Sequence, residues 1–477
     1  MLVLYIVLGI IAVLAATVLI RTLTFTPKKA SLPDVPSEEF DKNRSVEALR
    51  QLIRCKTVSY YDSALEDDGE FEKLVELLPE LYPSVCSSCE LKRFEGRALL
   101  FRWKGERSDA PSVMMAHYDV VPADEDKWDK PAFDALIEGG VLWGRGSLDT
   151  KVTVNAVMYA VDTLISRGFT PAQDVWLAFS GGEEVNGKGA KNIVEYFKQN
   201  GISPALVVDE GGAVVEDVFP GVKKPCGLVG IAEKGLMNMT FTVESNGGHA
   251  SAPEPHTPIG ILAEACRRVE KHPFPFHITK PTAEMFDTLG RYSTFGYRMI
   301  FANLWLFSGV LNMICKKKGG ETNALLRTTV AFTQASGSAA PNVIPPKASL
   351  VANMRLNPKD SVASATERIR RIVANDAVKL TVDGTEPSKI SRTDCPEWEK
   401  VSAAVAATWK GCIVAPYLMV QSSDSLSYGE ICDRVYRFCA MDLTAEERAT
   451  IHGHNERIRL ETVGKAVEFY LRLLKQC

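Results

Sequence analysis

Between residues 45 and 235, short apolar runs alternate with longer segments whose apolar residues recur at helical spacing. The runs at 112–117 (SVMMAH), 174–179 (DVWLAF) and 205–210 (ALVVDE) predict buried strands. Residues 152–168 (VTVNAVMYAVDTLISRG) predict a helix that stops at its glycine. Strands that alternate with helices in this way predict an α/β fold built on a mostly parallel sheet.

The pattern changes after residue 235, where the strand-like segments alternate apolar and polar residues. The order of elements within 236–392 is β-α-β-β-α-β, which predicts an inserted ferredoxin-like α+β domain. The α/β pattern resumes at 393–477, so the larger domain comprises 45–235 and 393–477. The predicted elements of the insert are strands at 235–245, 328–336, 348–358 and 378–384 and helices at 257–271 and 361–375.

One part of this insert, residues 274–320, is rich in aromatic and aliphatic side chains and includes FANLWLFSGVLNMICKKKGG. It is too apolar for a free loop, so we expect it to pack on the larger domain or to line a pocket. Membrane insertion is the weaker alternative, because the apolar run is shorter than a membrane span and ends in three lysines.

The N-terminus is different from the rest of the chain. Its first 20 residues (MLVLYIVLGIIAVLAATVLI) carry no charge and have the length of a helix that crosses a bilayer. We interpret residues 1–22 as a transmembrane anchor and residues 23–44, rich in Pro, Ser and charge, as a linker. A cleaved signal peptide and a buried core helix are the alternatives. Basic residues follow the span from Arg21 and none precedes it, which favours a cytoplasmic location for the folded part.

Composition narrows the class of protein. The chain has 477 residues, 46% of them hydrophobic, which is enough for a large core. Its net charge of −4, with interspersed charges, predicts no nucleic-acid partner. The 11 cysteines, an odd number spread along the chain, suit a reducing compartment better than a disulfide framework. Cys86 and Cys89 form a single CxxC pair, to which we assign no function.

Side chains of metal-ligand type lie at or near the ends of several predicted strands. The C-terminal edge of an α/β sheet is where ligands bind. Imidazole and carboxylate groups together suit zinc, and two ions can share a bridging carboxylate. An adjacent acidic pair suits such a site, because one carboxylate can bind a cation while the other moves protons. The sequence therefore predicts a two-metal site, with candidate residues His117, Asp119, Asp149, Glu183, Glu184, Asp209, His452 and His454.

Five stretches, HYDVVP, GRGSLDTK, GGEEVNGKG, GGHASAP and IHGHNE, resemble the successive signatures of the M20 family of zinc-dependent amidohydrolases and exopeptidases. The resemblance runs from about residue 45 to the C-terminus. NLWLF and APNVIPP are most similar to the branch that contains carboxypeptidase S and the N-acyl-amino-acid hydrolases. The resemblance implies two Zn2+ ions per chain.

The resemblance also implies a role for each candidate. Asp119, two residues from His117 on an extended segment, can hydrogen-bond the imidazole nitrogen that holds no metal. Glu183 is the implied general base, which polarises the attacking water and passes its proton to the leaving amine. The implied metal ligands are Asp149 as the bridge, His117 and Asp209 on one ion, and Glu184 and His452 on the other. The family pattern selects His452, four residues before a glutamate, and leaves His454 as its neighbour.

Other residues have implied roles outside the strand ends. His249 is implied to enter an active site, often that of a partner subunit, and to donate a hydrogen bond to the oxyanion. This implies a homodimer through the inserted domain and closure of that domain as a lid. Asn342 is implied to contact the substrate. In SSDSLSY, Leu426 stands where many relatives have an arginine, which leaves open how the substrate carboxylate is held. Arg355 can hold it; the alternative is that Arg355 pairs with a surface acid.

We therefore expect a membrane-anchored dizinc hydrolase that cleaves the amide bond next to a C-terminal amino acid, in a small peptide or an N-acyl amino acid. The apolar insert favours substrates with a hydrophobic acyl or side-chain portion. The alternatives are an aminopeptidase or dipeptidase of the same chemistry and a catalytically silent metal-binding scaffold protein. Glu183 beside a complete set of ligands speaks against a silent protein.

Overall fold

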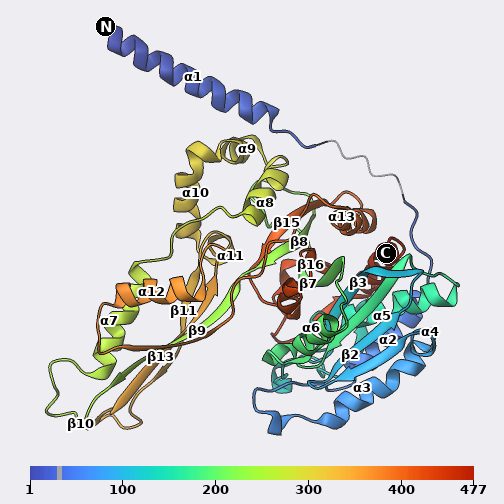
Figure 1. Ribbon diagram of the computed structural model, residues 1–477. Coiled ribbons are helices and arrows are strands. Elements are labelled where there is room, and N and C mark those ends of the chain that lie inside the picture. Colours follow the sequence, from blue (N-terminus) through green and yellow to red (C-terminus); the bar gives the residue numbers. More distant parts are fainter. Residues whose placement is uncertain (29–34) are drawn as a thin grey trace.

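The computed structural model describes residues 1–28 and 35–477 (Figure 1). Two bodies and a projecting N-terminal helix are visible, with the larger body on the right of the view and the smaller one on the left. Helix α1 (Leu2–Thr24) is long and apolar enough to cross a membrane, a property that a signal sequence at the N-terminus shares. The predicted linker at 23–44 lies partly outside the described residues.

The larger domain is built on an eight-stranded sheet with the order β1-β2-β6-β3-β7-β16-β8-β15. Its centre, β6-β3-β7-β16, is parallel, whereas β1, β2 and β8 each run antiparallel to a neighbour. Four of the seven neighbouring pairs are thus parallel and three are antiparallel. The sheet is mixed with a parallel centre, because connections such as the short β1–β2 turn permit only antiparallel pairing. The strands are β1 (Glu90–Phe94), β2 (Ala98–Trp103), β3 (Arg107–His117), β6 (Gln173–Ser180), β7 (Leu206–Val215), β8 (Cys226–Glu233), β15 (Ile413–Met419) and β16 (Val435–Leu443).

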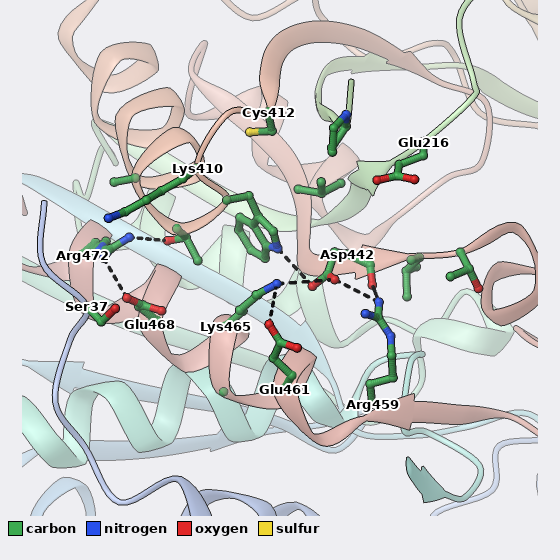
Figure 2. A pocket seen from close by; sticks show the side chains of 18 of the residues that line it. Ser37, Glu216, Lys410, Cys412, Asp442, Arg459, Glu461, Lys465, Glu468 and Arg472 are labelled. Atoms are coloured by element: carbon green, nitrogen blue, oxygen red, sulfur yellow. Dashed lines mark hydrogen bonds and ion pairs between the residues drawn. The ribbon is translucent and has the colours of Figure 1, made fainter. Parts of the chain in front are cut away.

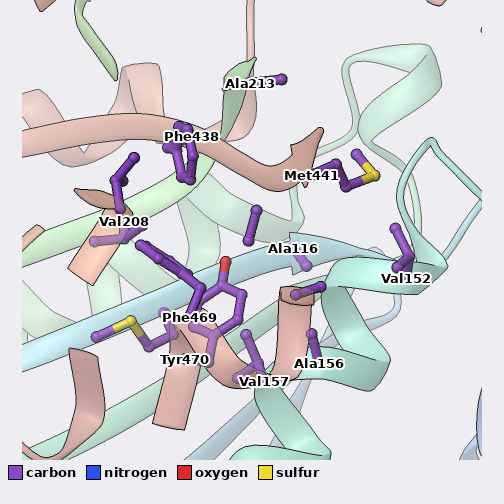
Figure 3. Close-up of a cluster of buried hydrophobic side chains, with 14 of the residues drawn as sticks. Ala116, Val152, Ala156, Val157, Val208, Ala213, Phe438, Met441, Phe469 and Tyr470 are labelled. Atoms are coloured by element: carbon purple, nitrogen blue, oxygen red, sulfur yellow. The ribbon is translucent and has the colours of Figure 1, made fainter. Parts of the chain in front are cut away.

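Helices cover this sheet and complete its core. The apolar period at 152–168 forms α5 (Lys151–Ser166), which contacts α2 (Lys42–Ile53) and α15 (Leu460–Leu474). Figure 3 shows side chains of α5 and α15, including Val157 and Phe469, meeting those of the sheet; both are fully buried. The remaining helices and small strands are α3 (Asp68–Leu81), α4 (Pro83–Ser88), α6 (Gly189–Gln199), α13 (Pro396–Thr408), α14 (Ala445–Arg448), β4 (Leu136–Glu138), β5 (Val141–Trp143) and β17 (Arg457–Arg459).

The smaller domain has the predicted β-α-β-β-α-β order. Its antiparallel sheet has the order β11-β13-β9-β14, and α7 and α12 pack together beside it. Alternating residues of β9, such as Met237 and Phe241, are fully buried in a core separate from that of the larger domain. The elements are β9 (Gly235–Glu244), α7 (Pro258–Lys271), β11 (Thr329–Ser336), β13 (Lys347–Leu356), α12 (Val362–Val373) and β14 (Lys379–Gly384), with a ribbon of β10 (Gly248–His249) and β12 (Val343–Ile344).

The apolar segment 274–320 forms helices that join the two domains. As expected, part of it packs on the larger domain: α8 lies against β15, and Phe286 and Phe301 pack with Phe219. A second part does not, because α10 exposes much of its apolar surface. The helices are α8 (Lys280–Gly290), α9 (Phe295–Ala302), α10 (Leu304–Lys318) and α11 (Gly320–Ala324).

Candidate active site

Acidic and imidazole side chains from distant segments meet at the C-terminal edge of the central strands. His117 is the last residue of β3, and Asp149 stands just before α5. A short 3-10 helix, Glu183–Val185, follows β6 and carries the adjacent glutamate pair. His452 comes from the loop after α14. The fold therefore gathers residues that are more than 300 positions apart at one sheet edge.

Asp149 lies between the two imidazoles. The Nε2 atom of His117 is 3.0 Å from Asp149 Oδ1 and 3.4 Å from Glu210 Oε2. On the other side, Nε2 of His452 is 3.0 Å from Asp149 Oδ2 and 3.1 Å from Glu184 Oε2. On each side of Asp149 there are thus one imidazole, one further carboxylate and one oxygen of Asp149 itself. Two divalent cations that share a bridging carboxylate require a donor set of this kind.

The structure brings Glu210, and not Asp209, into this cluster. Asp209 is 2% exposed and its Oδ2 accepts the backbone N–H of Ser425 at 2.9 Å. The pairing of β7 with β16 skips Glu210 and Gly211, so these two residues form a bulge that turns Glu210 towards His117. Gly211 has φ +149°, and a Cβ atom there would lie 2.6 Å from the Cβ of Arg437. The sequence signal for this bulge was the glycine pair in VVDEGG.

Asp119 holds the glutamate pair in place. Its two carboxylate oxygens accept the backbone N–H groups of Glu183 at 3.1 Å and Glu184 at 3.2 Å. Nδ1 of His117 lies 3.0 Å from the Asp119 carbonyl oxygen and 3.5 Å from its carboxylate. The expected contact to the imidazole is therefore made chiefly by the backbone, which still orients the ring so that Nε2 faces Asp149.

Glu456 is a supporting residue that the sequence analysis did not single out. Its Oε1 accepts the backbone N–H groups of Leu148 at 2.7 Å and Asp149 at 3.2 Å. Its Oε2 accepts a hydrogen bond from Arg145 at 2.7 Å, and both side chains of this ion pair are buried. This pair fixes the loop that presents Asp149. The signal was the glutamate of IHGHNE, read above only as a marker for His452.

The buried and crowded positions of these carboxylates and imidazoles shift their pKa values. Burial, only partly opposed by His117, raises the pKa of Glu210 to about 8. Burial and the neighbouring Glu210 raise the pKa of Glu183 well above its usual range. Hydrogen bonds to Asp149 and Glu184 raise the pKa of His452 to about 10. Burial alone would raise the pKa of Asp149, yet hydrogen bonds from both imidazoles hold it below its usual value.

These residues fit divalent cations. Two groups of three ligand atoms lie within 4.8 Å of one another: His117, Asp149 and Glu184, and His117, Glu183 and Glu210. Glu184 Oε1 is buried and has no hydrogen-bond partner among the described residues, as expected of a ligand atom reserved for a cation. Added positive charge would also oppose the rise in the pKa of Glu210 that burial causes.

A pocket of about 400 Å3 leads away from this cluster. The carboxylates of Glu183 and Glu210 line one part of it. Many of the other lining side chains are apolar, but Gln421, Ser422, Arg448 and Glu321 also line the pocket. Glu321 of α11 accepts a hydrogen bond from Tyr417 Oη (3.0 Å) and lies 3.8 Å from Arg448. The pocket can therefore take an apolar group next to the polar cluster, and its apolar lining includes Leu148, Val215, Leu228, Met419, Met441 and Leu443.

Arg355 of β13 lies behind one wall of this pocket. Its Nη1 donates a hydrogen bond to Oγ of Ser422, a lining residue, at 3.2 Å. Burial lowers the pKa of its guanidinium. Within residues 1–28 and 35–477, the structure records no ion pair for this side chain, so the alternative of a surface acid partner is not observed.

His249 and Asn342 lie together, but away from the carboxylate cluster. They belong to the β10–β12 ribbon, where Ala250 N donates to the Asn342 carbonyl oxygen at 2.9 Å. Figure 1 shows β10 at the end of the smaller domain that is farthest from the larger domain. Nδ1 of His249 accepts the backbone N–H of Ser251 at 3.1 Å, which leaves Nε2 as the protonated nitrogen of the neutral ring.

A second cavity, of about 970 Å3, lies elsewhere on the larger domain, between α13 and α15 (Figure 2). Its walls carry ion pairs, among them Arg472–Glu468 at 2.7 Å and Lys465–Glu461 at 3.1 Å. Because these charged groups pair with one another, the described residues of this cavity offer no comparable convergence of ligand atoms.

Comparison with known proteins finds similarity over most of the chain. The family model described as peptidase family M20/M25/M40 matches residues 113–476. "Probable carboxypeptidase S-like 2" of Dictyostelium discoideum is 32% identical over 96% of this chain and 90% of its own length. "N-fatty-acyl-amino acid synthase/hydrolase PM20D1" of Xenopus tropicalis is 33% identical over 98% and 93%. The crystal structure of an M20 family metallo-carboxypeptidase, Sso-CP2 from Sulfolobus solfataricus, superimposes with a TM-score of 0.68 at 16% identity, covering 90% of this chain and 98% of that one.

Proposed function

Because the chain belongs to peptidase family M20/M25/M40 and is thus an enzyme of the metallopeptidase type, we propose that it hydrolyses the amide bond next to a C-terminal amino acid. The substrate is a peptide with a free C-terminal amino acid or an N-acyl amino acid, with an apolar acyl or side-chain portion. The observation that carries this proposal is the carboxylate and imidazole cluster that opens into a largely apolar pocket.

Two zinc ions are the cofactors that the donor set supports best. His117, Asp149 and Glu210 would hold one ion, and Asp149, Glu184 and His452 the other. This set replaces the expected Asp209 by Glu210, because the Asp209 carboxylate already accepts a backbone N–H. When bound, such ions lower the pKa of water and stabilise negative charge on the substrate oxygen.

Glu183 is the proposed general base. Its backbone is held by Asp119, while its carboxylate lines the pocket beside the proposed ligands and has no recorded hydrogen bond among the described residues. A carboxylate in this position takes a proton from the attacking water and delivers it to the nitrogen of the leaving amine. Asp119 acts as a positioning residue, because it holds the backbone N–H groups of both glutamates.

Arg355 is the proposed partner of the substrate carboxylate. Arg355 is a partly buried cation without a recorded ion pair among the described residues. Ser422, a residue of the pocket wall, separates it from the pocket. A rotation of the Arg355 side chain past Ser422, or closure of the smaller domain, would bring the guanidinium to the pocket. It thereby supplies the positive charge that Leu426 does not.

His249 and Asn342 would act at the active site of a partner subunit. Their ribbon lies at the far end of the smaller domain, and the acceptor role of Nδ1 leaves Nε2–H of His249 free to donate to an oxyanion. This part of the proposal requires a homodimer through the smaller domain, which acts as a lid. Mixing a Glu183→Gln chain with a His249→Ala chain tests it, because the mixed dimer would regain one complete site.

The main test measures metal content and hydrolysis together. We expect about two zinc ions per chain in both wild type and Glu183→Gln, and hydrolysis of N-acyl amino acids or C-terminally free peptides by the wild type alone. Glu125→Gln, an exposed glutamate in a surface turn, serves as the matched control and should keep full activity. Bound zinc without turnover by the wild type would favour the silent metal-binding protein instead. Faster cleavage of substrates with a free N-terminus than of blocked ones would favour an aminopeptidase or dipeptidase.

A further inference from the structure

Helix α10 has an exposed apolar face. It packs inward through Leu311 and Cys315, which are buried. On the opposite side, residues 306, 310, 313 and 314 fall at the i, i+4, i+7 and i+8 positions of one helical stripe. No charged side chain interrupts the helix before Lys316. The exposed side chains, here called the α10 face, are Trp305 (55% exposed), Leu306 (40%), Val310 (40%), Met313 (64%) and Ile314 (44%).

The start of the helix that carries this face lies next to the apolar helix α1. Asn303, at the junction of α9 and α10, donates to the Val18 carbonyl oxygen at 3.3 Å and to Thr22 Oγ1 at 3.2 Å. Arg21 Nε donates to the Ala302 carbonyl oxygen at 3.1 Å. Figure 1 shows α9 beside the C-terminal end of α1, with α10 following it. A specific polar contact thus ties the end of α1 to the start of α10.

The loop after α1 strengthens this connection. The guanidinium of Arg291 lies 4.4 Å from the centre of the Phe25 ring and donates to the Thr26 carbonyl oxygen at 3.1 Å. Lys28 pairs with Asp287 of α8 at 3.5 Å. The chain leaving α1 is therefore held against α8 and α9 over several residues. The α10 face consequently has a defined place relative to α1.

We propose that the α10 face lies in the interfacial layer of a lipid bilayer, beside the point at which α1 enters that bilayer. The helix that carries the face begins at Asn303, which is hydrogen-bonded to α1, and the surface of α1 is almost entirely apolar and exposed. Trp305 stands at one end of α10 and Lys316, Lys317 and Lys318 at the other, a distribution that suits the headgroup region and anionic lipids. A second copy of the chain is the less suitable occupant, because its lysine row would bring like charges together.

Docking of α10 would also bear on the active site. Two glycines with positive φ, Gly319 and Gly320, connect α10 to α11, and Glu321 of α11 lines the pocket. The bilayer surface would thus lie one short helix from the pocket wall. This consequence rests on the proposed function, since it places the pocket near amphiphilic substrates in the membrane. The location of the face itself does not depend on catalysis.

Tryptophan quenching in the full-length chain tests the proposal. The chain is reconstituted into vesicles of phosphatidylcholine and phosphatidylserine, with or without bromine on the acyl chains. The difference between wild type and Trp305→Phe isolates the emission of Trp305. The matched control is Trp143→Phe, on β5 of the larger domain. We expect brominated lipid to remove most of the Trp305 emission and to leave that of Trp143 unchanged.

A second variant separates the α10 face from α1. Leu306→Asp combined with Met313→Asp should restore Trp305 emission in brominated vesicles, while α1 still holds the chain on vesicles in flotation. The proposal fails if Trp305 emission in the wild type is unchanged by brominated lipid. Acrylamide would then show whether water reaches the face, and crosslinking would show whether a second copy covers it. The hydrolysis assay decides the proposed function independently.

Discussion

The ion pair Glu233–Arg437 beneath the active site provides a quantitative test of the structure. Arg437 Nε lies 2.6 Å from Glu233 Oε2, and the side chains are 1% and 0% exposed. Glu233 Oε2 also accepts a hydrogen bond from Ser423 at 3.0 Å, whereas its Oε1 has no partner among the described residues. Arg437→Met would therefore leave a fully buried carboxylate with one neutral donor.

The expected cost follows from that burial. Removing one partner of a buried pair costs about 3–5 kcal/mol, because the remaining charge stays desolvated. With an m value of about 3 kcal/mol per M, the urea midpoint would fall by about 1–1.7 M. Removing both charges, in Glu233→Gln with Arg437→Met, should recover a large part of this loss.

The assay is urea unfolding followed by far-UV circular dichroism for the wild type, both single variants and the double variant. The control is Lys379→Met, which breaks the Lys379–Glu244 pair of similar length (2.7 Å), whose side chains are 68% and 54% exposed. Solvent screening makes such a pair weak, so its midpoint should not shift measurably. The reasoning is refuted if Arg437→Met shifts the midpoint no more than Lys379→Met, or if the double variant is as unstable as the single one.

Three further predictions concern the site and Lys234, which lies at the junction of β8 and β9. Glu210→Gln should lose about one zinc ion per chain by mass spectrometry, whereas Asp209→Asn should keep both; the reverse result would restore Asp209 as the ligand. Arg355→Met should lower kcat/KM for free carboxylate substrates by about 10- to 100-fold, the value of a charge-assisted hydrogen bond, and leave C-terminally amidated analogues unaffected. Equal losses on both would exclude carboxylate binding. Burial lowers the pKa of Lys234 from 10.5 to about 7, so the unfolded chain binds more protons and stability should rise between pH 7 and 10.5, by up to about 1.4 kcal/mol per pH unit. Urea midpoints of Lys234→Met across this range should lack that slope, and an unchanged slope would contradict the assignment.

The pattern of apolar residues was sufficient to predict secondary structure where a segment is buried or half-buried in a regular way. The helix predicted at 152–168 and the strand at 112–117 correspond to α5 and β3, because their apolar period matches the face that each must bury. The same reasoning found the order of elements in the smaller domain. The strands predicted at 112–117, 174–179 and 205–210 are parallel in the structure, as β3, β6 and β7. The antiparallel strands β1, β2 and β8 were not identified, because the pattern along one strand contains no information on which neighbour it pairs with.

The sequence predicted only in outline which site residues lie close together. The types of residue and their places after strands indicated a cluster, and the structure brings His117, Asp149, Glu184 and His452 within hydrogen-bonding distance of at least one other member. The choice between Asp209 and Glu210 was not accessible, since adjacent residues on a regular strand face opposite sides and a bulge changes that order.

The sequence by itself determined the chemistry available to this protein: acidic and imidazole groups at strand ends, an adjacent glutamate pair and two apolar segments in need of cover. The tertiary structure decided which carboxylate faces His117 and which side of α10 remains exposed. It also decided that Arg355 has no acidic partner among the described residues. The physical reason is that the periodicity of apolar residues indicates only which side of a single helix or strand is buried. Contacts between segments depend on register, bulges and domain placement, which arise only when distant parts of the chain pack together.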